Sequence, residues 1–472
     1  MSIKIALPKG RLMAETAALL RKANWGVSGY DEKMRFYRLK SSRFPEVSAR
    51  VFHEKDIPIQ VALGNYDLGI CGLDWVQELL VKYPSTALIK AKNLGYGKGA
   101  LYIAASRSEG GSTLERIQAR HEVVRIASEY PNLAEYFAVS SRMRRFSIFP
   151  LYGAAEVYPP ENAELVLIPW VSEEELLGFD LAPLGKVVDF GAFLIANKAS
   201  WKEKDFTEVL ASIGDRLAGE KENPVSVVSR KRPEKVSRYV ADVSPDTIRL
   251  ALPDGHQQLH TVDLLRRAGI EIHDYPSATE NRRPTTNLED VAVKVIRPQD
   301  MPSQVANGNF DLAVTGRDWL REHLNQFPSS PVTELVDLKY GRVRIVAVVS
   351  NELSVTDVDS LRQFSMQRTV PLRIASEYIN IADKYARDNH LGMYTVVPTW
   401  GASEACLPED ADLLIENTET GRTIARHNLK IIDMLFVSTG CLIGNKNSLA
   451  SLSKGERIGS IIEMMRAVVG GA

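Results

Sequence analysis

The chain is written twice, and this internal repeat constrains its fold more than any other feature. Four blocks of sequence recur in the same order in the two halves. The strongest pair is RIASEYPNLAEYFA at 125–138 and RIASEYINIADKYA at 373–386. The other pairs are 3–12 with 248–257, 55–78 with 299–322, and 149–168 with 397–416. A repeat has to be recognised first, because missing it misassigns the whole fold.

The spacing of the copies indicates a domain duplication. Leu7 matches Leu252, an offset of 245, and Arg125 matches Arg373, an offset of 248. The units of a solenoid are far shorter than this period. A charged, proline-containing segment joins the copies and is typical of a linker. We therefore expect a first copy in 1–222, a linker in 223–245 and a second copy in 246–472.

Within each copy, short aliphatic runs alternate with stretches of helical periodicity. The strands expected in the first copy are 3–7, 67–71, 101–104 and 165–168, and the expected helices are 12–23 and 75–81. Alternation of strands and helices is typical of α/β domains with parallel strand pairing. The sequence therefore predicts a duplicated α/β fold.

The overall composition restricts the classes of function. The 58 Lys and Arg residues nearly balance the 59 Asp and Glu residues, so no bulk attraction to nucleic acid or to a membrane surface is expected. Cys71, Cys406 and Cys441 form no CxxC pair, which argues against a disulfide framework and a thiolate metal site. The N-terminus reaches charged residues too soon for a signal peptide, and the apolar runs are too short to span a membrane. We expect a cytoplasmic protein.

The most specific chemical motif lies in the second copy. An aliphatic run ends at Glu416 and leads through Thr418 and Glu419 to TGRT at 420–423, before a helix-like stretch. Backbone N–H groups at a helix N-terminus bind phosphate, and a glycine lets the backbone approach the ligand closely. An acidic residue at a strand end accepts hydrogen bonds from ribose hydroxyls. Taken alone, TGRT is better explained as a threonine helix cap with a glycine turn.

The neighbouring motifs change this interpretation. Together with ALPKGRL, RPQDMP, DLAVTGRD, the ASEY block and GASE, the loop completes an ordered set that resembles the ATP phosphoribosyltransferase family, which opens histidine biosynthesis. The resemblance covers nearly all of both copies. It implies two tandem copies of a two-lobed, periplasmic-binding-protein-like (type II) fold, with the active site in the cleft between the lobes. It also implies transfer of the phosphoribosyl group of phosphoribosyl diphosphate (PRPP) to N1 of ATP, with Mg²⁺ as cofactor.

The resemblance also assigns roles to particular residues. The PRPP loop would consist of Glu416, Thr418, Glu419, Thr420, Gly421, Arg422 and Thr423. Other substrate contacts would come from Asp318 and, in the pocket of the same lobe, from Gly401, Ser403 and Glu404.

Three cations complete the implied site. Lys9, Arg11 and Arg297 would surround the triphosphate or the departing diphosphate. Displacement of diphosphate gathers negative charge on the leaving group, so cations already in place stabilise the transition state more than the ground state. These three residues are therefore the candidates for catalysis.

The copies divide the motifs between them. The first copy has Lys9 where the second has Asp254, and the second has Arg297 where the first has His53. At the loop position the first copy lacks TGxT and carries three consecutive glutamates, 173–175, which would repel a phosphate. We therefore expect PRPP to bind to the second copy and not to the first.

Two explanations of this division stay open. In one, the copies form an intrachain pseudo-dimer in which the second supplies the loop and the first lends cations. In the other, the chain is a non-catalytic regulatory or ligand-sensing relative. We favour the first, because an inactive scaffold needs neither an intact loop nor a KGR turn. Shorter family members suggest a histidyl-tRNA-synthetase-like regulatory subunit as a partner, no further domain is expected after the second copy, and a homo-oligomer is also possible.

Overall fold

The computed structural model describes most of the chain. The described residues are 2–31, 37–85, 87–109, 113–171, 176, 179–217, 244, 246–277, 281–401 and 403–470. The glutamates at 173–175 and, apart from Ser244, the expected linker at 223–245 lie outside these residues. Among the described helices, none is both long enough and apolar enough to cross a membrane.

The chain divides into two compact units that follow the two copies except for two short segments. Unit 1 comprises Met1–Pro150, Glu164–Arg232 and Thr399–Ala405, and unit 2 comprises Leu151–Ala163, Pro233–Pro398 and Cys406–Ala472. The two short segments occupy matching positions in the repeat. Each copy therefore contributes a piece to the compact unit of the other.

Unit 1 contains two mixed sheets. Their strand orders are β2-β3-β1-β4-β11-β5 and β10-β6-β9-β7-β8. The strands are β1 Ile3–Lys9, β2 Arg38–Lys40, β3 Val47–His53, β4 Leu68–Gly72, β5 Leu88–Asn93, β6 Gly99–Ser106, β7 Val124–Ser128, β8 Phe146–Pro150, β9 Leu165–Trp170, β10 Leu181–Phe190 and β11 Ala192–Asn197. The helices are α1 Met13–Lys22, α2 Ile57–Ala62, α3 Leu73–Lys82, α4 Leu114–Arg120, α5 Pro131–Ser140, α7 Lys198–Glu203 and α8 Thr207–Leu217, with the 3-10 turn η1 Arg107–Glu109.

Unit 2 repeats this layout. Its sheets have the orders β15-β12-β16-β23-β17 and β20-β19-β21-β18-β22, beside a two-stranded ribbon β13-β14. The strands are β12 Ile248–Pro253, β13 Ile272–His273, β14 Thr285–Thr286, β15 Val291–Ile296, β16 Leu312–Gly316, β17 Val332–Asp337, β18 Val343–Ser350, β19 Leu372–Ser376, β20 Tyr394–Pro398, β21 Leu413–Thr418, β22 Leu429–Ser438 and β23 Gly440–Asn445. The helices are α9 Gln258–Arg267, α10 Met301–Ala306, α11 Arg317–Gln326, α12 Val358–Met366, α13 Ile379–Asp388, α14 Arg422–Arg426, α15 Lys446–Leu449 and α16 Gly455–Gly470, and the 3-10 turns are η2 Ala155–Val157 and η3 Gly255–Gln257.

The strand order confirms the predicted duplicated α/β fold. The strands and helices expected in the first copy are all present, with bounds that differ by two residues at most. Parallel pairing holds for β3-β1-β4 and for β9-β7-β8, whereas β6, β10 and β11 pair antiparallel to their neighbours. The sheets are mixed because the chain crosses twice between the two lobes of each copy, from β5 to β6 and from β10 back into β11.

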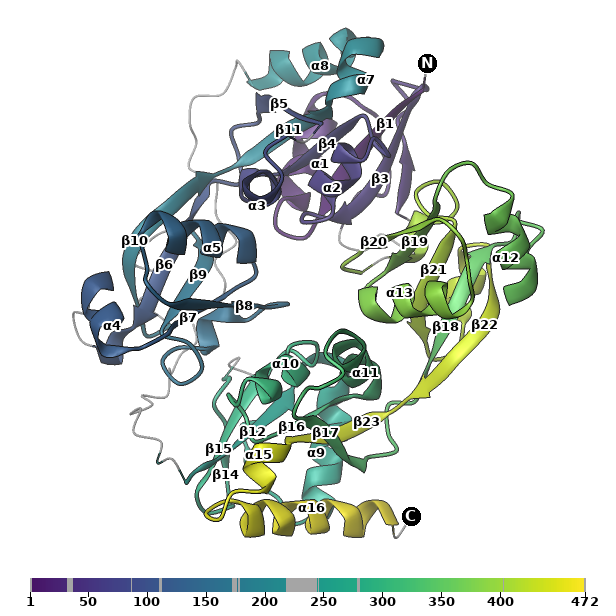
Figure 1. Cartoon of the computed structure of the whole chain (residues 1–472). Helices are drawn as coiled ribbons and strands as arrows, with labels where there is room; N and C mark the ends of the chain where they lie inside the picture. Colours follow the sequence, from purple (N-terminus) through teal and green to yellow (C-terminus); the bar gives the residue numbers. More distant parts are fainter. Residues whose placement is uncertain are drawn as a thin grey trace. The chain divides into compact units, whose positions relative to one another are not determined.

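The same double crossing occurs in unit 2. There the chain passes from β17 to β18 and returns from β22 into β23 (Figure 1). Two lobes, each with its own sheet and joined by two connections, make up the type II periplasmic-binding-protein fold. This part of the prediction is confirmed.

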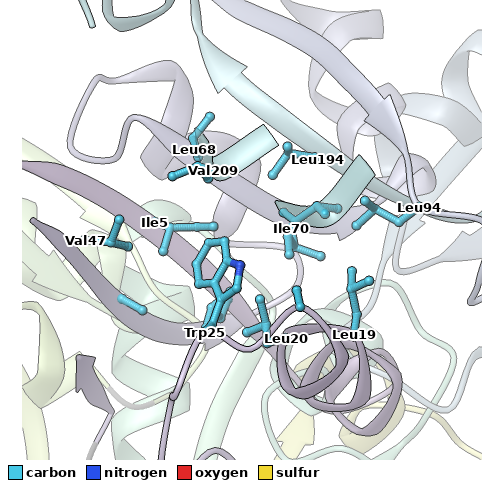
Figure 2. Close-up of a cluster of buried hydrophobic side chains, with 14 of the residues drawn as sticks. Ile5, Leu19, Leu20, Trp25, Val47, Leu68, Ile70, Leu94, Leu194 and Val209 are labelled. Carbon is cyan, nitrogen blue, oxygen red and sulfur yellow. The ribbon is translucent and has the colours of Figure 1, made fainter. Parts of the chain in front are cut away.

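Each lobe has its own apolar core. In the first lobe of unit 1, Leu19 and Leu20 of α1 pack with Trp25 against Ile5 and Ile70 of the sheet (Figure 2). The Trp25 side chain is fully buried, and its indole N–H donates to Ser212 Oγ at 3.0 Å. Because a buried Trp needs a partner for its N–H, this bond joins the core to α8.

The segment at 151–163 is held in unit 2 by polar contacts. The backbone N–H of Tyr152 donates to Asp300 Oδ1 at 2.9 Å. Lys294, on the edge strand β15, donates to Glu161 Oε2 at 2.9 Å and to Asn162 Oδ1 at 2.6 Å. Arg283 adds an ion pair to Glu161 at 3.2 Å. Burial lowers the pKa of Lys294 to about 7, an effect to which Arg283 adds and which Glu161 opposes.

The buried lysine makes the stability of unit 2 depend on pH. Between a pKa near 7 in the folded protein and its ordinary pKa in the unfolded chain, this lysine is protonated only when the chain is unfolded. Because the unfolded state then binds more protons, the free energy of unfolding rises with pH across this range. The change amounts to about 1.4 kcal/mol per pKa unit. We expect wild-type protein to gain stability between pH 6.5 and 9.5 relative to Lys294→Met, as measured by urea unfolding. Lys384→Met, on the exposed surface, is the control, and a constant difference between wild type and Lys294→Met would contradict the account.

Candidate functional site

The TGRT loop comes directly after β21, the central strand of the second sheet of unit 2. Glu416, expected at the end of the strand, and Thr418, expected in the turn after it, both lie inside β21, because the strand pairs with β18 as far as Thr418. Gly421 has a φ of +75°, in the left-handed region that favours glycine. Its N–H donates to Thr418 Oγ1 at 3.0 Å. The helix that follows, α14, has only five residues, so the turn itself and not a long helix shapes the loop.

The base of the loop is tied to the first lobe by a chain of hydrogen bonds. The side-chain amide of Asn417 donates to the hydroxyl of Tyr378 at 2.9 Å, and Tyr378 donates to Asp318 Oδ2 at 2.6 Å. Ser438 Oγ donates to the other oxygen of Asp318 at 2.8 Å. Burial and the neighbouring Asp318 carboxylate raise the pKa of Tyr378 well above its ordinary value, so its hydroxyl stays protonated. Asp318, expected to contact substrate, is buried and positions the loop base through Tyr378.

Arg344 is a residue that the sequence analysis missed. It lies on β18 opposite Thr418, and its Nη2 is 3.7 Å from the position that a Cβ on Gly421 would take. Arg344 makes no hydrogen bond or ion pair to any residue within the described ranges, so its charge is available beside the turn. Arg344 reaches the loop only through the register of β18 against β21, and sequence motifs do not show this register.

The cation expected in the second copy is already paired. Arg297 Nη1 lies 3.1 Å from Asp254 Oδ2, and Arg282 Nη1 lies 2.8 Å from the same oxygen. Asp254 stands at the position of Lys9 in the first copy. This reversal of charge is visible in the sequence, whereas the contact with Arg282, which lies outside the repeat motifs, is not.

Arg11 of the first copy is enclosed by carboxylates of its own unit. Its Nη2 lies 2.8 Å from Glu54 Oε2 and 2.9 Å from Asp74 Oδ2, and its guanidinium lies 4.6 Å from the centre of the Phe190 ring. Burial alone would lower the pKa of Arg11, but Asp74 and Glu54 outweigh it and raise the pKa. The charge of Arg11 therefore serves unit 1, and nothing in this arrangement leaves it for a leaving group.

Lys9 differs from Arg11 in this respect. Its Nζ donates to the hydroxyl of Tyr37 at 3.0 Å, and no carboxylate of the described chain pairs with it. Burial lowers the pKa of His53 to about 4, with Lys9 and Lys55 adding to the effect, so this histidine is neutral at neutral pH. Of the two first-copy cations that the sequence analysis named, Lys9 is the one available to an anion.

The GASE residues are grouped with the compact unit of the first copy. Gly401, Ser403 and Glu404 belong to the segment Thr399–Ala405, which is part of unit 1, whereas the TGRT loop is part of unit 2. The expectation that they line a pocket of the loop's own lobe stays a prediction. The neighbouring Trp400 gives a physical reason for the grouping with unit 1, because its ring lies 4.8 Å from Lys55 Nζ, a cation–π contact.

The first copy has no counterpart of the loop base. The residues that match Glu416, Asn417 and Thr418 are Ile168, Pro169 and Trp170. All three lie within β9, and the Trp170 ring packs edge-on against Phe179 with centroids 4.8 Å apart. The three glutamates at 173–175 lie outside the described residues. Ile168 and Pro169 have no polar side-chain atoms to offer to ribose hydroxyls or to a phosphate.

Comparisons with known proteins agree with the duplication. The family described as ATP phosphoribosyltransferase matches the chain over 53–219 and 297–467. ATP phosphoribosyltransferase of Prosthecochloris aestuarii is 31% identical over 231 residues, 48% of this chain and 73% of that protein. The protein of that name from Saccharolobus solfataricus is 31% identical over 233 residues, 47% of this chain and 72% of its own. The solved ATP phosphoribosyl transferase (HisG:HisZ) complex of Thermotoga maritima contains a chain that is 22% identical and matches 48% of this chain and 100% of its own, with a TM-score of 0.39.

The turn at Gly421 provides a test of the loop. Aspartate at 421 places a negative charge in the turn and strains a backbone at φ +75°, so Gly421→Asp is expected to abolish PRPP binding. Replacement of the glutamates at 173–175 by glutamine is expected to leave PRPP binding intact. Isothermal titration calorimetry with PRPP measures both variants. Normal binding by both would show that the loop assignment is wrong.

Proposed function

The chain belongs to the ATP phosphoribosyltransferase family, and from this premise we propose that it transfers the phosphoribosyl group of PRPP to N1 of ATP. The products are phosphoribosyl-ATP and diphosphate, and the reaction is the first step of histidine biosynthesis. The observation that carries the proposal is the second-copy loop, in which a left-handed glycine and two threonine hydroxyls lie at the end of β21 beside Arg344, which pairs with no residue that the structure describes.

The loop offers donors suited to a phosphorylated ribose. The Thr418 hydroxyl accepts from the Gly421 N–H, which leaves its own proton to donate to a phosphate oxygen. Arg344 and the exposed Arg422 supply positive charge on the two flanks of the turn. We propose that Glu416, which is half-buried at the loop base, accepts hydrogen bonds from the ribose hydroxyls.

In the proposed reaction the adenine N1 attacks the anomeric carbon of the ribose. The bond between this carbon and the diphosphate oxygen breaks, and its electron pair leaves with the diphosphate. The chain needs no covalent intermediate for this step. Its contribution is to hold the ribose phosphate and to place positive charge where the leaving group becomes more negative.

Mg²⁺ is part of the proposal. Among the residues that the structure describes, no group of three or more His, Cys, Asp or Glu side chains is arranged to hold a metal ion. Mg²⁺ commonly keeps several waters and binds through substrate phosphates with one or two carboxylates, so Glu416 and the exposed Glu419 fit it as additional ligands. When bound with the diphosphate it would neutralise charge on the leaving group.

We also propose a cytoplasmic location and no nucleic-acid partner. The near balance of charge gives no reason to expect nucleic acid as a partner, and a biosynthetic enzyme that consumes ATP fits a cytoplasmic location. A histidyl-tRNA-synthetase-like regulatory subunit and an intrachain pseudo-dimer both remain predictions.

Product formation tests the proposed function. Purified full-length protein with ATP, PRPP and Mg²⁺ is expected to form phosphoribosyl-ATP, detected by absorbance and mass spectrometry. Gly421→Asp is the matched control and is expected to reduce the rate by at least roughly 100-fold, as loss of transition-state contacts does in other enzymes. If the wild-type protein binds PRPP but forms no product under forcing conditions, the chain is a regulatory relative and not an enzyme.

A further inference from the structure

The second half of helix α5, in the first copy, exposes two neighbouring apolar side chains. Tyr136 is 56% exposed and Val139 is 61% exposed. They lie three positions apart within the helix, so they share one of its faces. Glu135 is exposed on the same face, four positions before Val139. Single exposed apolar residues are ordinary on protein surfaces, so the meaning of this pair depends on its surroundings.

Two arginines follow directly after this face. Met143 anchors the end of the helix, because its N–H donates to the carbonyl of Ala138 and its side chain packs in the core of the lobe. Arg142 and Arg144, on either side of Met143, are both exposed. Their side chains make no hydrogen bond or ion pair to any residue that the structure describes. Two guanidinium groups are therefore available beside the apolar pair.

The matching face of the second copy has its charges paired within one helix. Lys384 and Arg387 of α13 stand where the first copy has its apolar pair. Each forms an ion pair at 2.8 Å with an aspartate four positions away, Asp388 for the lysine and Asp383 for the arginine. The two available arginines are replaced there by a histidine and a glycine. The exposed apolar pair with its arginines is therefore a property of the first copy and not of the fold.

The face on α5 is self-complementary about Val139. At a rise of about 1.5 Å per residue, Glu135 lies about 6 Å before Val139, and Arg142, just past the end of the helix, lies nearly as far after it. Two such helices packed antiparallel about a two-fold axis at Val139 place Glu135 of each chain against Arg142 of the other. Tyr136 then also comes against this arginine, and a guanidinium group is attracted to an aromatic ring. The face thus fits a copy of itself, as an isologous dimer requires.

We propose that the α5 face, defined by Glu135, Tyr136, Val139 and Arg142, binds the same face of a second copy of the chain. Val139 packs against its counterpart at the centre, and the ion pairs between Glu135 and Arg142 lie at the rim, as in interfaces with an apolar core and a polar border. A face of this size is small, so the dimer is weak and reversible. None of its residues belongs to the TGRT loop or to the cations considered for catalysis, so the inference is independent of the proposed function.

Replacement of the apolar pair by the residues of the second copy is the first test. Full-length wild-type protein is expected to dimerise reversibly in sedimentation equilibrium between about 1 and 200 µM, a range suited to a small interface. The double variant Tyr136→Lys with Val139→Arg is expected to weaken dimerisation at least roughly tenfold, because it removes the apolar centre and places like charges opposite each other. Leu259→Lys, which removes an exposed apolar side chain from α9, is the control and is expected to leave the dimerisation constant unchanged.

Two results of this experiment overturn the proposal. One is a wild-type protein that stays monomeric over the whole range of concentration. The other is a double variant that dimerises as tightly as the wild type, since the chain would then associate through another surface.

Reversal of the rim charges tests the two-fold arrangement itself. Glu135→Arg and Arg142→Glu each place like charges opposite each other in a dimer of identical chains, so each variant alone is expected to dimerise at least roughly tenfold more weakly than the wild type. An equimolar mixture of the two variants restores opposite charges at both rim positions and is expected to dimerise within about threefold of the wild type. The thermal midpoint of each variant shows that it is folded. A mixture that associates no more than the separate variants contradicts the pairing of Glu135 with Arg142 and overturns the proposal.

Discussion

A buried hydrogen bond between a tyrosine and an aspartate joins the two lobes within each copy. Tyr130 donates to Asp74 at 2.8 Å in the first copy, and Tyr378 donates to Asp318 at 2.6 Å in the second. Each aspartate lies in the first turn of a helix, where the helix dipole favours a negative charge. Since both groups are buried, neither can be left without a partner at low cost. This contact acts together with the bonds that Glu78 and Glu322 accept from the backbone at the start of α5 and of α13.

The copies differ in what else binds to this aspartate. In the first copy Arg11 and Glu54 complete an ionic cluster around Asp74, and the matching loop base is apolar. In the second copy Ser438 takes the place of the charged partner, and the tyrosine also accepts from Asn417 at the start of the loop. The same architecture therefore contains an ion cluster in the first copy and supports the TGRT loop in the second copy. Pro169, which matches Asn417, has no side-chain donor and could not make this connection.

Much of this could be predicted from the sequence. The repeat, the α/β class and the strand bounds follow from local patterns, and the loss of TGxT from the first copy is visible in the letters. The reversal of charge at Asp254 is visible in the sequence, but its pairing with Arg297 and Arg282 was not predicted. Arg282 comes from a segment outside the repeat blocks, so no repeat pattern points to it. Arg344 was missed because only the register of β18 against β21 brings it to the loop. The placement of Gly401, Ser403 and Glu404 in unit 1 depends on contacts far apart in sequence, which no local pattern encodes.

The central claim is that the duplicated chain keeps one PRPP site, in its second copy. The most direct measurement is the stoichiometry of PRPP binding to the full-length chain, by equilibrium dialysis with radiolabelled PRPP. The account predicts one molecule bound per chain at saturation. Two molecules per chain would show that the first copy binds despite its apolar strand end, and no binding would show that the loop at Gly421 does not recognise PRPP.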